Sequence, residues 1–231
     1  MKTTWTMAVM CLAGLVLAAG CDMGGATGGP AGWWPMDEGS ALAVKNKEGV
    51  NDGKIEGGLK WVDGKSGKAL SFNGKGYVVI DTANYLSSPQ YTFTAWVNLK
   101  DTGDHQYIVW RGGPEFPEAK ECRNLDIWLT TDGRLSGTVD PKAGGGRIQM
   151  TGTIKVADGK WHHVACVIDG KKMTFFVDGK KDVEENLPGP LADNNFPLWI
   201  GARPGDVAAT GIIDEVKFYT RALSPEELTT K

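Results

Sequence analysis

The sequence has few of the features of a nucleic-acid-binding or zinc-dependent protein. Its 231 residues include only 3 histidines, and 25 Lys and Arg against 28 Asp and Glu give a net charge of −3. No basic run is visible, whereas nucleic-acid-binding domains normally carry a basic patch. No Cys/His spacing of a zinc site is present. The composition therefore argues against a nucleic-acid partner.

Long hydrophobic runs are also absent, apart from one near the N-terminus. Residues 7–19 follow a single lysine and are mostly apolar, but they are too few to span a bilayer and are typical of a secretory signal. The segment LAAGC (17–21) resembles a bacterial lipobox, although Ala18 stands where Leu is commoner. The resemblance implies a signal peptide over residues 1–20, a lipidated Cys21 and anchorage to a bacterial membrane, on the periplasmic side or at the cell surface. Ordinary secretion with cleavage beside Gly20 is the alternative.

Cysteine is scarce in the remaining chain, where only Cys122 and Cys166 are left. Cys166 lies in an apolar segment and is expected to be a small buried hydrophobic residue. Cys122 lies in a polar loop. An exported location permits a disulfide between the two, which is the less favoured interpretation.

The chain is divided into a short tether and one domain. Residues 21–32 are rich in glycine and have no apolar period, so they are expected to form a flexible tether. No second linker follows, and residues 33–231 are predicted to form one domain. Seven Asp-Gly or Asn-Gly pairs, which favour tight hairpin turns, punctuate it at positions 52, 63, 73, 132, 158, 169 and 178.

Segments with the period of β-strands lie between these turns, and no stretch has a sustained helical period. Residues 92–99 and 124–130 alternate between apolar and polar side chains, and 161–177 has the pattern of a hairpin. Residues 212–219 are predicted to form a final strand. Ser224, Pro225 and Glu227 form a capping box at the start of one short C-terminal helix. The pattern predicts an all-β, antiparallel two-sheet sandwich.

Seven motifs in order resemble one family over almost all of 33–231. They are WPMDEG (34–39), VNDGKI (50–55), GKALSFNG (67–74), YTFTAWV (91–97), KWHHVA (160–165), TFFVDGK (174–180) and GIIDEVKFYTRALS (211–224). The set resembles the laminin-G-like, concanavalin A-like lectin/glucanase domains of bacterial secreted proteins. The resemblance implies a jelly-roll sandwich with one concave face. It implies function only weakly, since lectins, adhesion modules and hydrolases share this fold.

Enzymatic activity is not favoured by the carboxylates. Glucanases of the family carry an arrangement like Glu-x-Asp-x-x-Glu on one strand. Here Asp126 occupies the middle position, but Asn124 and Leu129 stand where the carboxylates are needed. Asp214 and Glu215 are expected to point to opposite faces of their strand, so they are not expected to flank one bond. His162 and His163 are interpreted as packing residues at a strand start.

A calcium site is one interpretation of Asp214. By alternation this residue is expected to share a face with Ile212, Val216 and Phe218, and a buried carboxylate needs a partner. Several domains of the family bind calcium, and Asn46 and Asp52 of the loop 46–53 are candidate oxygen ligands together with Asp214. The alternative is that Asp214 accepts hydrogen bonds from loop amides, Trp indoles or Arg221.

The remaining polar and aromatic positions suggest binding of a glycan. Trp96, Trp128, Arg111 and Asp126 are expected to share the concave face, where indoles would cover a pyranose ring and polar groups would meet its hydroxyls. The alternative is that the indoles form a hydrophobic layer under loops. We therefore expect a non-catalytic, envelope-anchored module that binds a glycan or glycoconjugate. A hydrolase with another carboxylate arrangement and a protein-protein adhesion module are the alternatives.

Overall fold

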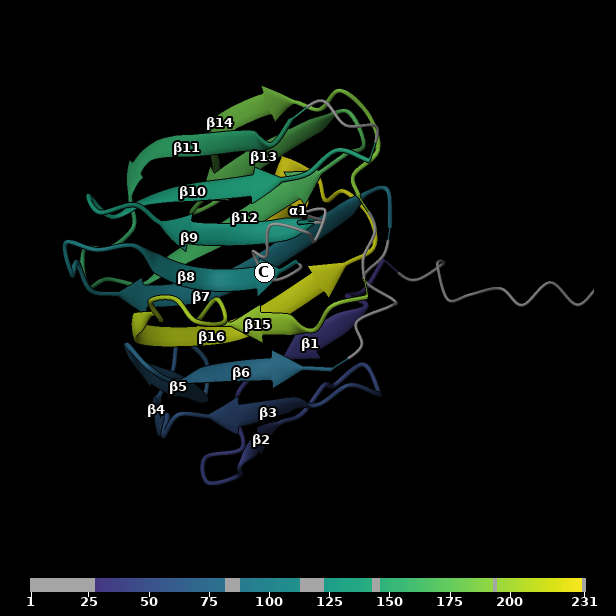
Figure 1. The fold of residues 1–231 in the computed structure, drawn as a ribbon. Helices are drawn as coiled ribbons and strands as arrows, with labels where there is room; N and C mark the ends of the chain where they lie inside the picture. The colour runs from purple at the N-terminus through teal and green to yellow at the C-terminus, as the bar shows by residue number, and fades with distance from the viewer. Residues whose placement is uncertain (1–27, 82–87, 113–122, 143–145, 193–194, 230–231) are drawn as a thin grey trace, which may run out of the picture.

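The computed structural model describes residues 28–81, 88–112, 123–142, 146–192 and 195–229. Two antiparallel β-sheets are stacked face to face (Figure 1), which confirms the predicted all-β sandwich. The expectations on the signal peptide, Cys21 and Cys122 lie outside the described residues. Within them, no helix has the length and apolar character needed to cross a membrane.

The first sheet, called sheet A, contains the strands that the patterns at 92–99, 161–177 and 212–219 predicted. Its strands run in the order β14-β13-β12-β7-β16-β5-β4, and β1 also pairs with β16. Their bounds are β1 Gly32–Trp34, β4 Lys60–Asp63, β5 Lys68–Asn73, β7 Tyr91–Leu99, β12 His162–Ile168, β13 Lys172–Val177, β14 Lys180–Asn186 and β16 Thr210–Tyr219.

The second sheet, called sheet B, forms a ladder from β11 at the top of Figure 1 to β2 at the bottom. Its order is β11-β10-β9-β8-β15-β6-β3-β2. The bounds are β2 Ala43–Val44, β3 Gly53–Glu56, β6 Tyr77–Ile80, β8 Gln106–Arg111, β9 Leu125–Leu129, β10 Arg134–Val139, β11 Ile148–Lys155 and β15 Leu198–Ile200.

The core lies between the sheets and is filled by the side chains that alternate inward. The strand patterns predicted this: the apolar sets of β7 and β9 are buried in one cluster, namely Phe93, Ala95, Val97, Leu99, Leu125, Ile127 and Leu129. Cys166 belongs to the same cluster, is free and is fully buried, as expected for a small hydrophobic residue. Burial raises the pKa of its thiol, so the thiolate is disfavoured.

Four register shifts interrupt the pairing of the described strands, and two of these bulges lie at or beside Arg111 and Asp214, which the sequence predicted as site residues. In β8 the pairing shifts between Tyr107 and Val109, and in β16 it shifts between Asp214 and Lys217. Glu215, at the second bulge, has a φ of 51°, which is rare for residues other than glycine. Each bulge inserts one residue, so the residues after it face the side opposite to the one that strict alternation predicts.

The C-terminal helix forms where the capping box predicted it. Helix α1 spans Pro225–Thr229, the amide of Glu227 bonds Ser224 Oγ at 3.4 Å, and the amide of Ser224 bonds Glu227 Oε2 at 3.0 Å. The helix and the segment before it pack on the outer face of sheet A, in a second apolar cluster of Ala165, Val167, Phe176, Tyr219, Leu223 and Leu228.

Candidate functional site

The outer face of sheet B gathers aromatic and polar side chains around Asp126. Asp126 of β9 pairs with Trp110 of β8 on one side and with Thr138 of β10 on the other. Trp128 pairs likewise with Tyr107 and Ser136. Residues directly opposite each other in an antiparallel pair share a face. We call this set the sheet B site; its members are Tyr107, Trp110, Asp126, Trp128, Ser136 and Thr138.

Asp126 is the charged centre of the sheet B site. Its side chain is only 3% exposed, and its Oδ2 accepts a hydrogen bond of 2.8 Å from Thr138 Oγ1. Arg123 Nε lies 3.9 Å from the same oxygen. Oδ1 is buried and has no hydrogen-bond partner among the described residues. Burial raises the pKa of this carboxyl to about 6, against the opposing effects of Thr138 and Arg123.

Among the aromatic rings beside Asp126, Trp128 is partly exposed, whereas Tyr107 and Trp110 are buried. The rings of Tyr107 and Trp128 are 6.0 Å apart at an angle of 38°, and Trp128 is partly exposed. Arg203 Nη1 donates to the Tyr107 hydroxyl over 3.1 Å, which fixes that ring. Trp110 is 3% exposed, and its indole Nε1 has no hydrogen-bond partner in the described part of the chain. A half-exposed indole beside polar groups suits contact with a molecule that has both apolar and hydroxyl-bearing surfaces.

Arg111 does not belong to this face, contrary to the sequence prediction. The β8 bulge turns Trp110 outward opposite Asp126 and turns Arg111 inward opposite Leu125, a core residue. Arg111 is 1% exposed, and its Nε donates to the carbonyl oxygen of Phe196 at 3.3 Å. Without the bulge, strict alternation would have placed Arg111 outward with Asp126.

Trp96 is likewise separated from Asp126 and Trp128, so the predicted grouping of the four residues is wrong. Trp96 lies on β7 of sheet A, while β9 belongs to sheet B, and both strands direct their polar sides away from the common core. The Trp96 ring lies 5.3 Å from that of His163, and Lys65 Nζ lies 4.3 Å from its centroid. The protein's own side chains therefore cover part of this indole.

Asp214 is held by backbone amides, the alternative that the sequence left open. It is fully buried and pairs with Trp96, so it faces outward, while Val216 and Phe218 lie in the core beyond the bulge. The expected shared face with Val216 and Phe218 is therefore wrong. Its Oδ2 accepts from the amides of Lys65 and Ser66 at 2.8 and 3.1 Å. Burial raises its pKa to about 6, although these amides favour the charged form.

Glu215 occupies the β16 bulge, so the strict alternation that would direct it to the face opposite Asp214 does not apply. Its Oε2 accepts from Trp33 Nε1 at 3.0 Å and lies 2.9 Å from Lys217 Nζ. Lys217 faces outward, opposite Thr94 of β7. Both carboxylates are occupied by contacts within the protein, so this pair offers no open acid-base arrangement.

Asn46 and Asp52 are brought together, but they do not contact Asp214. Asn46 Oδ1 accepts from the backbone amide of Trp33 at 3.0 Å, and the backbone amide of Asn46 donates to Asp52 Oδ1 at 3.1 Å. Asp214 instead bonds to the turn at residues 65–66. No group of three or more His, Cys, Asp or Glu that suits a metal ion occurs among the described residues. Calcium binding by these residues stays a prediction.

The two adjacent histidines serve the structure of a strand start, as predicted. His162 bonds Asp178 Oδ2 at 2.8 Å and Asp158 Oδ1 at 3.1 Å. His163 is 6% exposed and lies against Trp96. Burial lowers the pKa of His163 to about 4, so its ring is neutral near pH 7.

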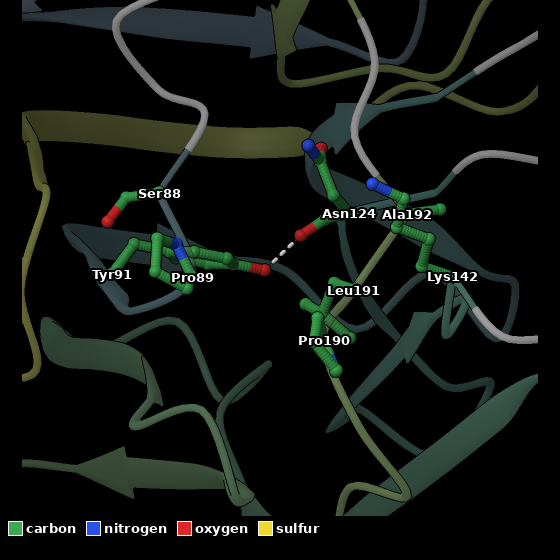
Figure 2. A pocket seen from close by; sticks show the side chains of 8 residues that line it. All are labelled: Ser88, Pro89, Tyr91, Asn124, Lys142, Pro190, Leu191 and Ala192. Atoms are coloured by element: carbon green, nitrogen blue, oxygen red, sulfur yellow. Dashed lines mark hydrogen bonds between the residues drawn. The ribbon is translucent and has the colours of Figure 1, made fainter.

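A pocket of about 230 Å³ lies at one end of the sandwich (Figure 2). It is lined by residues from four chain segments: Ser88, Pro89, Tyr91, Asn124, Lys142, Pro190, Leu191 and Ala192. The Tyr91 hydroxyl donates to the carbonyl oxygen of Asn124, as the dashed line in Figure 2 shows. Asn124 directly precedes β9, so the pocket lies at the Asp126 end of that strand.

Several residues of the site and the pocket were not predicted from the sequence. Tyr107, Trp110 and Thr138 depend on strand pairing and on the β8 bulge, which no local pattern indicates. Alternation of 134–139 about Leu135 could have placed Thr138 on an outer face. Lys142 and the segment 190–192 carry no sequence signal for a pocket.

The family match confirms the resemblance. Residues 72–229 match the family described as the Concanavalin A-like lectin/glucanases superfamily, and the chain belongs to this family.

Solved structures share the fold at low sequence identity. Domain 4 of the extracellular arabinanase AbnA from Geobacillus stearothermophilus, solved with arabinotriose, is 22% identical with a TM-score of 0.68, over 87% of this chain and 97% of that domain. The binding domain of Paraclostridial Mosquitocidal Protein 1 is 18% identical with a TM-score of 0.66, and the match covers 87% of this chain and 51% of that one. The receptor-binding domain of botulinum neurotoxin mosaic serotype C/D is 11% identical with a TM-score of 0.67, and the match covers 87% of this chain and 50% of that one. The chain thus spans about half the length of the two toxin domains.

Proposed function

We propose that this chain is a non-catalytic module that binds a glycan or glycoconjugate through the sheet B site, at the bacterial cell envelope. The observation that carries the proposal is the position of the partly exposed Trp128 beside the buried Asp126 and its partner Thr138. The indole offers an apolar face to a sugar ring, and the carboxyl beneath it would offer a hydrogen-bonding group to a hydroxyl that reaches its buried Oδ1.

The similar structures support binding as the activity. Their names describe a domain in complex with arabinotriose and two toxin binding domains. The arabinotriose complex involves a domain that this chain matches over nearly its whole length. We therefore infer that arabinan and other polysaccharides are the first ligands to screen.

A hydrolase is the weaker proposal. Retaining and inverting glycosidases use two carboxyl groups that flank the scissile bond. Asp140 is the carboxylate that also contacts Arg123, but its Oδ2 accepts from the Arg123 amide at 3.0 Å and its Oδ1 lies 3.5 Å from Arg147 Nε. Asp140 is thus committed to structural contacts, and Asp126 lacks a free acid partner on its strand.

Affinity electrophoresis of the full chain in gels containing different polysaccharides, arabinan included, tests the proposal. A binding polysaccharide retards the wild type. Trp128→Ala is expected to reduce affinity by about tenfold or more, because a stacked indole contributes on the order of 2 kcal/mol. Trp96→Ala is the matched control, since it removes an indole from the other sheet.

Two results would contradict the proposal. Equal losses in Trp96→Ala and Trp128→Ala would show that the sheet B site is not the binding surface. Release of reducing ends from any polysaccharide by the wild type would show turnover and favour the hydrolase.

A further inference from the structure

We propose that the pocket of Figure 2 binds a terminal sugar that carries a carboxylate, such as a hexuronic acid, while the rest of the glycan runs along β9 toward Trp128. The inference rests on the proposed function and adds a ligand class to it. Three features of the pocket support it: a wall held by backbone hydrogen bonds, and an amide oxygen and a lysine side chain that have no polar partner within the described part of the chain.

The wall of the pocket is fixed by backbone hydrogen bonds before any ligand binds. The amide of Lys142 donates to the carbonyl oxygen of Pro190 at 2.8 Å, and the amide of Ala192 donates to that of Asp140 at 2.8 Å. An isolated bridge joins Pro141 to Leu191. Little conformational freedom is left to lose on binding, which favours affinity.

The polar lining includes a buried amide that lacks a partner. Asn124 is 7% exposed, and its Oδ1 has no hydrogen-bond partner among the described residues. A buried acceptor without a partner is costly, so a bond from a ligand hydroxyl would be favourable once the Asn124 amide turns its Oδ1 toward the pocket. Sugar hydroxyls provide such donors, while Pro89, Pro190 and Leu191 offer apolar surfaces to the ring carbons.

The charge of the pocket comes from Lys142. This side chain is exposed and has no carboxylate within 4.0 Å in the part of the chain that the structure describes. The neighbouring arginines differ: Arg147 pairs with Asp140, and Arg123 approaches Asp126. The ammonium group of Lys142 is thus available to a ligand anion, and a carboxylate on the sugar would form a charge-assisted hydrogen bond with it.

The position of the pocket links it to the sheet B site. Asn124 precedes β9, which carries Asp126 and then Trp128, and Lys142 follows β10, which carries Thr138. A glycan whose end occupies the pocket would therefore pass Asp126 before it reaches the Trp128 ring. One acidic end residue followed by further sugars is the ligand that this order of groups fits.

Two trisaccharides that differ only at the non-reducing end test the inference, one ending in glucuronate and the other in glucose. Titration calorimetry on the full chain is expected to show about tenfold tighter binding of the glucuronate-ended trisaccharide. Lys142→Gln is expected to weaken binding of the glucuronate-ended trisaccharide about tenfold and so to abolish this preference. Lys75→Gln, at an exposed lysine in the turn between β5 and β6, is the matched control and should keep the preference.

The outcomes separate this inference from the proposed function. Binding that depends on Trp128 but shows no preference for glucuronate, or a preference that survives in Lys142→Gln, would overturn the pocket assignment alone. If neither these trisaccharides nor any polysaccharide of the gel screen binds, both proposals fall. A thermal melt of each variant shows that a lost preference does not arise from unfolding.

Discussion

The outer faces of the two sheets carry similar residues but differ in how far the hydrogen-bonding groups of those residues are satisfied. On sheet A, Asp214 accepts hydrogen bonds from two turn amides, Lys65 lies over the Trp96 ring, and α1 covers part of the remaining face. On sheet B, Asp126 Oδ1 and Trp110 Nε1 are buried without hydrogen-bond partners among the described residues. The contacts on sheet A stabilise the fold, whereas the unsatisfied groups on sheet B are the ones that the proposed function assigns to a ligand.

The largest effect on stability is expected at Asp214. Asp214→Ala removes the acceptor for two turn amides and leaves them in a protein environment, so it should lower the free energy of unfolding by about 3 kcal/mol. Urea denaturation followed by tryptophan fluorescence measures the change. Asp63→Ala, at an exposed carboxylate near the same turn, should leave the midpoint unchanged. A midpoint for Asp214→Ala equal to that of the wild type would mean that sheet A does not depend on this contact.

The second-largest effect is expected in the pH dependence of the free energy of unfolding, to which the titrating groups on the two outer faces contribute differently. The pKa values of Asp126 and Asp214 are raised from 3.8 to about 6, so each folded carboxyl holds a proton that the unfolded chain has lost. Their contributions are complete below about pH 4 and are lost as the pH rises to about 6. The pKa of His163 is lowered from 6.5 to about 4, so its contribution changes in the opposite direction and is lost as the pH falls from 6.5 to 4.

On sheet A the pH dependences of Asp214 and His163 have opposite signs and offset each other. On sheet B the pH dependence of Asp126 has no such counterpart among the histidines of the described chain. The free energy of unfolding should therefore fall between pH 4 and 6, by an amount on the order of 2 kcal/mol. Asp126→Asn should flatten the curve, and His163→Gln should steepen it. Denaturant titrations at several pH values measure both. A curve for Asp126→Asn as steep as that of the wild type would contradict the assignment.

A smaller effect is expected at Thr138. Thr138→Val removes the hydrogen bond to Asp126 Oδ2 while keeping the shape of the side chain. The change should lower the free energy of unfolding by about 1 kcal/mol and raise the pKa of Asp126 further. Carboxyl titration by NMR measures the pKa. Thr174→Val, on the outer face of sheet A, is the matched control and should not move it.

The smallest effect is expected where a lysine covers the Trp96 ring. Lys65→Gln should change the free energy of unfolding by no more than about 0.5 kcal/mol, because an exposed cation–π contact is weak. Affinity for any ligand of the sheet B site should not change. A large loss of that affinity would mean that the two faces are coupled.

The fold was predictable from the sequence because its signals are local. The alternation of 92–99, the turn at Asp169-Gly170 and the capping box at Ser224 each produced the expected element. The candidate site was less predictable because it depends on which strands pair with one another and in which register. Nothing local indicates that Trp96 and Trp128 belong to different sheets, and the β8 bulge reverses the direction of Arg111. Asp126 and Trp128 share a face as expected, since β9 contains no bulge.

The pairing of β1 with β16 has a mechanical consequence. Gly32, Trp33 and Trp34 pair with Phe218, Lys217 and Val216, and the Gly28 carbonyl oxygen accepts from Arg221 Nη2 at 2.8 Å. A pull on the chain at Gly28 is thus transmitted first to the last strand, at the middle of sheet A. Separation of β1 from β16 would therefore expose Trp34 and the core beneath it before the edge strands of either sheet separate.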